Sequence, residues 1–471
     1  MKAERSRTLP TSPDDPSAGD AHPRRHLIFV IVSTALFMSS IDQTIVATAL
    51  PALHRDLHAG INWSGWTITV YALGRVIVMP LIGKVGDRLG RRRVFLLAIA
   101  LFTMASLACG LANNIYLLVA LRAVQAFGGG AFMPSATGIV ADYFGRNRDR
   151  AVGLFTSIVP IGAIVGPILG GLFVTYWSWR GIFLVNVPIG AALIVLGLKY
   201  IPPGASQPSS RIDFVGILLL SVSLLAAMLG VTYLGGEGTS VLSPDFLVPE
   251  AVAVAGITLL LRHASRDPAA IIPMRLLRGR GFGVMNLINF LYGSAALGFG
   301  ALVPLYAQQR YGMHALAAGT LLTARAVGMI GIAALAVLAL RRTGYRLPML
   351  IGFVISAAGL AMMAIGPASG MSTYVWLATA AAVTGVGMGL ALPAANNASL
   401  QLDPNQVSAI AGLRSTFRQT GSIAAVSVTT AVLARSLAPG IAQGHIFLIF
   451  AAILVAMLPL IILVPEHRGT W

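Results

Sequence analysis

Asp42 is the acidic residue that falls well inside an apolar segment, in the run Ile41-Asp42-Gln43-Thr44. The chain holds 16 Asp and Glu residues, and the others fall in tails, loops or the ends of apolar segments. Inside a lipid bilayer a carboxylate is costly, so it is kept mostly where a proton or a cation binds. We therefore interpret Asp42 as a site of proton coupling, and the alternative is a structural hydrogen-bonding role.

Five arginines also fall inside apolar segments, where each must face protein, a cavity or the membrane interface. Arg122, in Leu121-Arg122-x-x-Gln125, is the candidate partner or gate for Asp42, and a static packing role is the alternative. Three of the others either line a cavity for anionic groups or anchor near the inner face, and the sequence leaves both open. These three are Arg325, Arg414 and Arg418.

A substrate cavity between membrane helices needs some polar side chains to orient its ligand. We expect the polar residues inside the apolar segments to supply that lining. The positions assigned to it are Gln43, Arg75, Gln125, Asn397 and Arg418.

A glycine-rich basic stretch follows the second apolar segment and is predicted to form a conformational lock. It combines turn-forming glycines, one acid and a run of arginines. We expect Asp87 to cap a helix N-terminus and Arg88 to pair with Asp142, in one conformation of the protein. The alternative is that the stretch sets membrane topology alone. The residues assigned to the lock are Gly83, Asp87, Arg88, Gly90, Arg91 and Asp142.

A stripe of small residues in the fifth apolar segment predicts a tight helix interface. Gly162, Gly166 and Gly170 recur every four residues, and Pro167 loosens the local backbone hydrogen bonding. Simple helix packing is the alternative. We expect the stripe to lie between two halves of a carrier and to take part in its conformational change.

The sequence lacks the common catalytic motifs. It contains no Gly-x4-Gly-Lys-Ser/Thr, no His-Glu-x-x-His and no Gly-x-Ser-x-Gly. The eight histidines are scattered, and the single cysteine, Cys109, permits no intramolecular disulfide. We therefore expect no enzyme activity, no metal site and no cofactor.

The composition indicates a membrane protein in which helices position these residues. Of 471 residues, 56% are hydrophobic and 10% charged, whereas soluble domains average about 25% charged. Apolar runs of about 17 to 25 residues predict an all-α polytopic protein. We place fourteen transmembrane helices, at 27–50, 62–82, 94–112, 115–140, 151–175, 181–200, 214–234, 246–262, 282–306, 315–340, 347–366, 373–397, 407–435 and 444–464.

The net charge of +17 is distributed unevenly over this topology. With the N-terminus in the cytoplasm, the inner loops and tails hold 24 of the 33 Lys and Arg residues, and the outer loops hold four. This bias predicts a multi-pass protein with both termini cytoplasmic. It also accounts for the basic clusters without nucleic acid as a partner. Arginine outnumbers lysine 30 to 3, which is typical of GC-rich bacterial genomes and indicates the inner (cytoplasmic) membrane.

An internal repeat appears at an offset of 259 residues. Ala123-Val124-x3-Gly128-x-Gly130-x3-Pro134 matches Ala382-Val383-x3-Gly387-x-Gly389-x3-Pro393. Two repeated bundles in the same orientation are typical of carriers that rock around a central site. The predicted parts are a disordered tail at 1–26, a six-helix bundle at 27–200, a linker and inserted helix pair at 201–281, a second six-helix bundle at 282–465 and a tail at 466–471.

Several of these motifs resemble the major facilitator superfamily, and in particular its fourteen-helix drug:proton antiporter branch. The stretch 83–93 is similar to the signature loop between the second and third helices, and 162–171 to the antiporter motif of the fifth helix. The segments 42–51, 177–190 and 418–421 also resemble that branch. Arg75 departs from the pattern, where a small residue is usual, and two consequences stay open: an altered proton coupling or a preference for a less cationic substrate.

The resemblance implies proton-coupled efflux of amphipathic or hydrophobic small molecules, including drugs, by alternating access. In that case Asp42 binds the proton and Arg122 is its functional partner. The expected partners are a small-molecule substrate, protons and the lipid bilayer, and a monomer suffices. Two alternatives remain open: a dedicated exporter of one metabolite or natural product and, more distantly, a membrane receptor that does not transport.

Overall fold

The computed structural model describes residues 24–144, 151, 154–155, 158–202, 213–236, 239–267, 270, 274, 280–367, 370–402 and 407–464. These residues form helices joined by short turns, and none of them lies in a strand. The helices are α1 (Arg25–Asp56), α2 (Ile61–Leu89), α3 (Arg91–Leu111), α4 (Ile115–Phe144), α6 (Ile158–Tyr176), α7 (Gly181–Leu184), α8 (Asn186–Tyr200), α9 (Phe214–Leu234), α10 (Pro244–Arg266), α12 (Arg280–Tyr292), η3 (Gly293–Gly298), α13 (Phe299–Tyr311), α14 (Ala315–Thr343), α15 (Arg346–Ile365), α16 (Thr373–Leu400), α17 (Val407–Arg435), α18 (Pro439–Ala456) and α19 (Leu458–Ile461).

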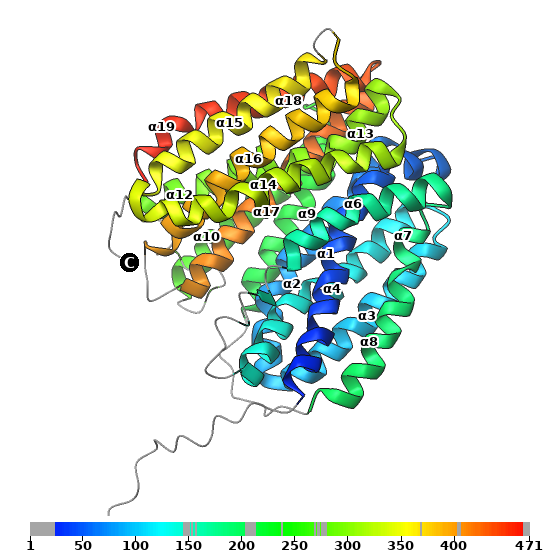
Figure 1. The fold of residues 1–471 in the computed structure, drawn as a ribbon, viewed down its shortest axis with the longest axis vertical. Coiled ribbons are helices and arrows are strands. Elements are labelled where there is room, and N and C mark those ends of the chain that lie inside the picture. The colour runs from blue at the N-terminus through cyan, green and yellow to red at the C-terminus, as the bar shows by residue number, and fades with distance from the viewer. Residues whose placement is uncertain are drawn as a thin grey trace, which may run out of the picture.

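The helices form two bundles that lie side by side (Figure 1). The N-terminal bundle contains α1 to α8, and the C-terminal bundle contains α12 to α19. Each bundle has its own buried apolar core. The predicted tails and most of the predicted linker lie outside the described residues.

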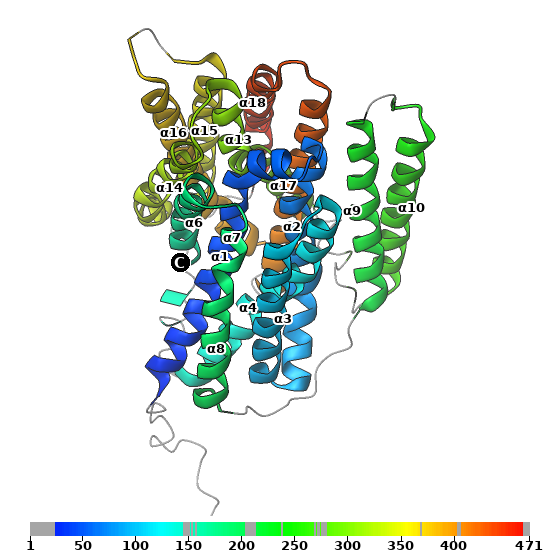
Figure 2. The same cartoon turned by 90° about the vertical axis from the view of Figure 1, so that its right-hand side faces the viewer.

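The pair α9 and α10 stands at the edge of the two bundles, with α9 nearer to them than α10 (Figure 2). Trp66 Nε1 of α2 donates a hydrogen bond to Thr232 Oγ1 of α9 at 2.7 Å. Met228 of α9 packs with Leu73 of α2 and Ile423 of α17 in one apolar cluster. The pair is thus attached where the two bundles meet.

Eleven of the described helical segments are long and apolar enough to cross a membrane. Each of the fourteen predicted ranges is helical over most of its described residues, so the all-α prediction is confirmed. The segments outside the eleven are α2, α17 and the α12–α13 stretch. α2 and α17 carry arginines within the predicted spans, and η3 divides the last stretch into two helices of 13 residues.

The predicted repeat also has a structural counterpart. Gly128 of α4 closely approaches Ala98 O of α3, and Gly387 of α16 closely approaches Gly352 O of α15. A Cβ at position 128 would lie 2.7 Å from the first oxygen, and a Cβ at position 387 would lie 2.5 Å from the second. Repeated glycines therefore serve the same purpose in both bundles, which is close helix packing.

The two sides of the molecule differ in charge. The side where α1 begins holds the arginines around Arg91 and Arg346, and we call it the basic side. The side where α1, α6 and α17 end is the far side, and it carries the arginines of the predicted outer loops.

Candidate functional site

Asp42 and Arg122 form an ion pair inside the N-terminal bundle. Arg122 Nη1 of α4 lies 2.7 Å from Asp42 Oδ2 of α1, and the two side chains are 1% and 0% exposed. A buried charge is tolerated when it is paired and its remaining hydrogen-bonding atoms are satisfied. The structure thus brings the predicted acid and its predicted partner into direct contact.

The other carboxylate oxygen of Asp42 accepts hydrogen bonds from two amides. Gln125 Nε2 donates to Oδ1 at 3.0 Å, and Asn186 Nδ2 of α8 donates to the same oxygen at 3.2 Å. Gln125 Nε2 also lies 2.6 Å from Ser106 Oγ of α3. Nitrogen donors from three side chains therefore converge on the two carboxylate oxygens of Asp42.

Arg122 is held by groups other than Asp42 as well. Its Nε donates to the backbone oxygen of Thr67 at 3.0 Å, and its guanidinium lies 4.0 Å from the centre of the Tyr71 ring. Its Nη1 also donates to Gln125 Oε1 at 2.6 Å. Because these contacts do not depend on the charge of Asp42, Arg122 keeps anchors when the carboxylate is neutralised.

The small-residue stripe of α6 packs directly beside this site. A Cβ on Gly166 would lie 2.9 Å from Ile41 O, and a Cβ on Gly170 would lie 2.6 Å from Ile45 O. Gly162 approaches Ser40 and Ile41 in the same way. The expectation that these glycines lie between the two halves is therefore wrong: they bring α6 against α1 within the N-terminal bundle.

The contact between the bundles uses the neighbouring face of α6. A Cβ on Gly171 would lie 2.5 Å from Leu316 Cα of α14, and Gly319 approaches the backbone oxygen of Pro167. Thr323 Oγ1 of α14 donates to Ile164 O at 3.2 Å. Pro167 is thus the member of the predicted set that lies at the interface between halves.

Further contacts between the bundles lie at similar depth. Gln308 Nε2 of α13 donates to Thr48 O of α1 at 3.4 Å. A Cβ on Gly65 of α2 would lie 2.8 Å from Thr430 Cγ2 of α17. Together with the α6–α14 contacts, these pairs join the bundles toward the far side, and we call them the far-side seal.

The predicted lock lies on the basic side, and part of it is described. Gly90 has φ = 90°, a left-handed conformation that suits glycine and separates α2 from α3. Arg91 Nη1 donates to Gly138 O of α4 at 3.0 Å. Arg88 is exposed in the last turn of α2. The side chains of Asp87 and Asp142, and position Gly83, lie outside the described part, so the predicted pair stays a prediction.

The predicted cavity residues do not form one cluster. Arg75 Nη1 of α2 donates to Gln43 Oε1 of α1, so two of them are in contact within the N-terminal bundle. Gln125 belongs to the Asp42 network. Asn397 Nδ2 donates to Pro393 O of its own helix at 3.0 Å, and Arg418 lies on α17 in the other bundle.

A cavity of about 550 Å³ opens between the bundles near the far side. Its lining residues come from both halves and include His54, Arg55, Gln308, Gln309 and His314. It lies beyond the far-side seal, at the ends of α1 and α13. This cavity is therefore distinct from the Asp42 network, which is closed inside its bundle.

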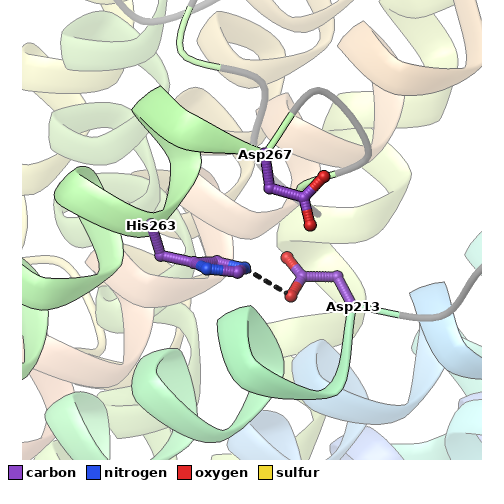
Figure 3. Close-up of side chains that lie close together, drawn as sticks. All are labelled: Asp213, His263 and Asp267. Atoms are coloured by element: carbon purple, nitrogen blue, oxygen red, sulfur yellow. Dashed lines mark hydrogen bonds and ion pairs between the residues drawn. The ribbon is translucent and has the colours of Figure 1, made fainter.

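Three potential metal ligands lie together at the base of the α9–α10 pair (Figure 3). The ligand atoms of Asp213, His263 and Asp267 are within 4.8 Å of one another. His263 Nε2 lies 2.7 Å from Asp213 Oδ1, and the same oxygen accepts from Gly216 N at 2.7 Å as the cap of α9. A helix cap and an ion pair account for this arrangement, which links the start of α9 to the end of α10.

The sequence analysis missed several members of the Asp42 network. Asn186 lies in the segment 177–190, which resembles the antiporter branch, but the sequence analysis predicts no function for its side chain. Ser106 and Tyr71 are ordinary polar and aromatic residues of apolar segments, and Thr67 contributes a backbone oxygen. Asn186 had a usable signal, because an amide inside an apolar helix needs a polar partner.

Comparison with known families identifies one match over most of the chain. A family model described as Major Facilitator Superfamily matches residues 32–426. A relative in Bacillus subtilis, the multidrug transporter protein MdtP, is 30% identical over 372 residues, covering 79% of this chain and 68% of that protein. The multidrug resistance protein B homolog of Mycobacterium tuberculosis is 31% identical over 402 residues, covering 85% and 74%.

A third relative, the tetracenomycin C resistance and export protein of Streptomyces glaucescens, is 29% identical over 408 residues, covering 85% of this chain and 74% of that protein. Among solved structures, a POT family transporter in complex with a thioalcohol conjugated peptide is similar, with a TM-score of 0.69 and 17% identity. That match covers 94% of this chain and 96% of the other. The inward open xylose transporter XylE of E. coli gives 0.64 at 14% identity, covering 95% and 98%. These structures support the fold alone.

Proposed function

The chain belongs to the Major Facilitator Superfamily, and we propose that it exports amphipathic or hydrophobic small molecules in exchange for protons. It is a multi-pass membrane transporter rather than an enzyme, as its relatives are. Multidrug resistance and export proteins among those relatives support efflux as the direction of transport. The energy source in this proposal is the proton gradient, without a cofactor, and one chain suffices because it contains both bundles.

The observation that carries the proposal is the buried network around Asp42. Its carboxylate has 0% exposure and accepts from Arg122, Gln125 and Asn186. Arginine stays protonated in proteins, so within this network Asp42 is the group that can take up and release a proton. A proton on Asp42 removes the charge attraction to Arg122 and changes the balance of contacts between α1 and α4.

Alternating access requires that this local change alter the contact between the bundles. The connection proposed here runs through α6. Its glycines pack against α1 beside Asp42, and its Pro167 and Gly171 contact α14 across the interface. A shift of α1 relative to α4 therefore reaches the far-side seal through α6, which contacts both. In this proposal a single outward-facing conformation releases the substrate to the outside and takes up the proton from the outside.

The proposed topology places the basic side in the cytoplasm. The arginine bias predicts this orientation, and both termini then lie inside. Fourteen membrane crossings follow if α2, the α12–α13 stretch and α17 also span the bilayer. In α2, Arg75 donates a hydrogen bond to Gln43 of α1. α17 packs against η3 and α2, so part of its surface faces other helices rather than lipid. In a bacterium this means the cytoplasmic membrane.

Transport in inverted vesicles under an imposed pH gradient tests the proposal. We expect accumulation of a fluorescent amphipathic dye that stops when the gradient is collapsed. Asp42→Asn removes the proton acceptor and keeps a similar volume, so proton-driven transport is expected to fall to the level of empty vesicles. Undiminished proton-driven transport by Asp42→Asn contradicts the proposal.

Asp56→Asn is the matched control for this experiment. Asp56 ends the same helix, α1, but is exposed on the far side. Its replacement removes one carboxylate from the helix without touching the buried network. We expect wild-type transport from this variant, and an equal loss in both variants contradicts a specific role for Asp42.

A dedicated exporter of one natural product is the second candidate. One observation favours it: the relative from Streptomyces glaucescens is named for the export of tetracenomycin C, and this chain covers 74% of it. A competition panel distinguishes the two candidates. Inhibition of dye transport by one compound class supports a dedicated exporter, and inhibition by many unrelated classes supports broad efflux.

A further inference from the structure

We infer that the molecule exported by this protein is an amphipathic organic anion, and that its acidic group binds near Arg325 and Arg418 in the C-terminal bundle. The inference rests on the proposed function, because it names the substrate class of that transporter. Four observations carry it: the charge of the bundle, the surroundings of Arg418, the π-helical segment beside it and the depth of the arginines.

The described helices of the C-terminal bundle contain arginines but no Asp or Glu. From residue 268 to residue 464 the sequence contains one acidic residue, Asp403, which lies between α16 and α17. The helices of this bundle nevertheless carry Arg325, Arg414 and Arg418. Positive charge inside a membrane protein is retained where it meets an anionic partner or a water-filled path.

Arg418 has donor capacity that the described residues do not use. Its Nη1 is fully buried and has no hydrogen-bond partner in the described part of the chain. Arg414, one turn away on α17, donates its Nη1 to Asn396 O at 3.0 Å, while its Nε also lacks a partner there. Buried donors of charged groups without partners are costly, so a ligand that accepts from them gains affinity.

A π-helical segment lies directly against Arg418. Gly293 begins η3, and a Cβ there would lie 2.8 Å from Arg418 Cα, so this position accepts no side chain. Ser294 Oγ donates to Gly421 O of α17 at 3.0 Å, which fixes the contact. Single π-helical turns occur frequently at functional sites because they disturb the regular helix ladder. Here the disturbance lies beside the arginine.

The residue before η3, Tyr292, lies near both arginines. Tyr292 interacts with both Arg418 of α17 and Arg325 of α14. Its hydroxyl oxygen is buried and has no hydrogen-bond partner among the described residues. Three helices therefore direct two positive charges and one phenol toward a common region of the bundle.

The depth of the arginines matches that of a central binding site. Arg325 follows Thr323 of the far-side seal by two residues, which is about 3 Å along the helix toward the basic side. Arg418 lies about 8 Å from Ile423 in the same direction, and Ile423 packs with Leu73 of α2. Both arginines thus lie just inside the seal, deeper than residues that reach lipid headgroups.

The N-terminal bundle does not supply the missing negative charge. Asp42 is closed inside its own bundle and paired with Arg122. Arg75, on the helix that packs against α17, adds another positive charge, and its buried Nε has no partner among the described residues. Beyond the Asp42–Arg122 pair, the membrane helices therefore contribute a surplus of arginines, which attracts anions and repels cations.

This substrate charge has a consequence for the energetics of transport. A proton moving in and an anion moving out both carry positive charge into the cell. Exchange of one proton for one monovalent cation moves no net charge. An inside-negative potential therefore accelerates export of an anion, since the field acts on the charge that is moved.

Two dyes with the same xanthene skeleton test the inference, fluorescein as the anion and rhodamine 6G as the cation. Equilibrium binding to the purified full chain in detergent is measured by fluorescence polarisation, which needs no proton gradient. We expect wild-type protein to bind fluorescein at least about tenfold more tightly than rhodamine 6G. Arg418→Gln and Arg325→Gln are expected to weaken fluorescein binding about tenfold or more.

Two further variants separate a loss of charge from a loss of folding. Arg418→Lys keeps the positive charge and is expected to retain most of the fluorescein affinity. Arg342→Gln removes an exposed arginine at the end of the same helix as Arg325, and it is expected to bind as wild type. Equal weakening by Arg342→Gln, or preference of the wild type for rhodamine 6G, overturns the inference.

Failure of the inference and failure of the proposed function give different results. If rhodamine 6G is transported by the proton gradient but fluorescein does not bind, the proposal of proton-driven export stands and the inference of an anionic substrate is overturned. Fluorescein binding that depends on Arg418, with transport that ignores the pH gradient, supports the binding site and contradicts proton coupling. Faster fluorescein transport with an imposed potential, negative on the side that represents the cytoplasm, supports both.

Discussion

The two bundles treat their buried charges in opposite ways. In the N-terminal bundle, Asp42 and Arg122 neutralise each other. Side-chain amides from α4 and α8 donate hydrogen bonds to the other carboxylate oxygen of Asp42. In the C-terminal bundle, Arg325 and Arg418 lie in helices that contain no acid. The repeat makes the contrast sharper, because the position that corresponds to Arg122 at an offset of 259 is Ala381.

This difference suggests a division of labour between two copies of one ancestral bundle. A closed, self-neutralised network suits a proton site, since protonation changes its internal balance without a ligand. A bundle with surplus positive charge, and with an Arg418 donor that no described residue accepts, suits substrate binding, since an anionic ligand can supply the acceptor. Both bundles share glycine-based helix packing, so the divergence concerns chemistry rather than architecture.

The largest expected effect comes from breaking the internal pair. Arg122→Gln leaves the Asp42 carboxylate buried without its cation, and removal of one member of such a pair costs about 3 to 5 kcal/mol. We expect a marked drop of the thermal unfolding temperature in detergent. The double variant Asp42→Asn/Arg122→Gln is expected to recover part of it. A double variant less stable than Arg122→Gln alone contradicts the pairing.

A matched pair of glycine variants separates packing within a bundle from packing between bundles. Gly166→Ala forces a Cβ to within 2.9 Å of Ile41 O beside the Asp42 network, at a cost of about 1 to 3 kcal/mol. Gly171→Ala crowds Leu316 Cα at 2.5 Å across the interface. We expect the first to lower the unfolding temperature and the second mainly to expose the far side.

Cysteine accessibility measures the second effect. In a background where Cys109 is replaced by Ser, a cysteine introduced at the far-side cavity, Gln309→Cys, reports on the opening of the seal. Faster labelling with Gly171→Ala, and unchanged labelling with Gly166→Ala, is the expected result. The reverse order contradicts the assignment of the two glycines.

A smaller effect is expected from the amide of α8. Asn186→Ala removes one donor to Asp42 Oδ1 and costs about 1 kcal/mol in stability. If Asn186 stabilises the protein through its hydrogen bond to the charged Asp42 carboxylate, Asn186→Ala lowers the stability less in the Asp42→Asn background than in the wild type. Thermal unfolding of the two single variants and the double variant measures this coupling, and additive losses place Asn186 outside the network.

The smallest effect is expected outside both bundles. His263→Gln removes the ion pair with Asp213 at the base of α9 and α10, where the histidine side chain is 23% exposed. Partly exposed pairs contribute about 0 to 1 kcal/mol. We expect near-wild-type stability and transport, with no response to a chelator. A large loss, or inactivation by the chelator, assigns a metal-dependent role to this cluster.

Much of the architecture follows from patterns within single helices. Apolar segment lengths located the helices, and the i, i+3 spacing of Arg122 and Gln125 placed both on one face. The cost of a charge in lipid singled out Asp42. These arguments need no knowledge of neighbouring helices, which is why they work from one sequence.

The remaining features depend on contacts between segments far apart in the chain. Thr67 participates through a backbone oxygen, which has no signature in the residue type. The glycine stripe predicts a close approach but not the partner helix, which is α1 of the same bundle rather than a helix of the other half. The interruption at η3 depends on packing against α17, and apolar periodicity alone does not reveal it.

Proton release on substrate binding is the most direct test of the Asp42 site. The purified protein is mixed with saturating substrate in a nearly unbuffered solution, and a soluble pH indicator reports released protons. Wild-type protein and Asp56→Asn are expected to release protons when substrate binds, and Asp42→Asn is expected to bind substrate without release. Equal proton release from Asp42→Asn and the wild type contradicts the assignment of Asp42 as the coupling residue.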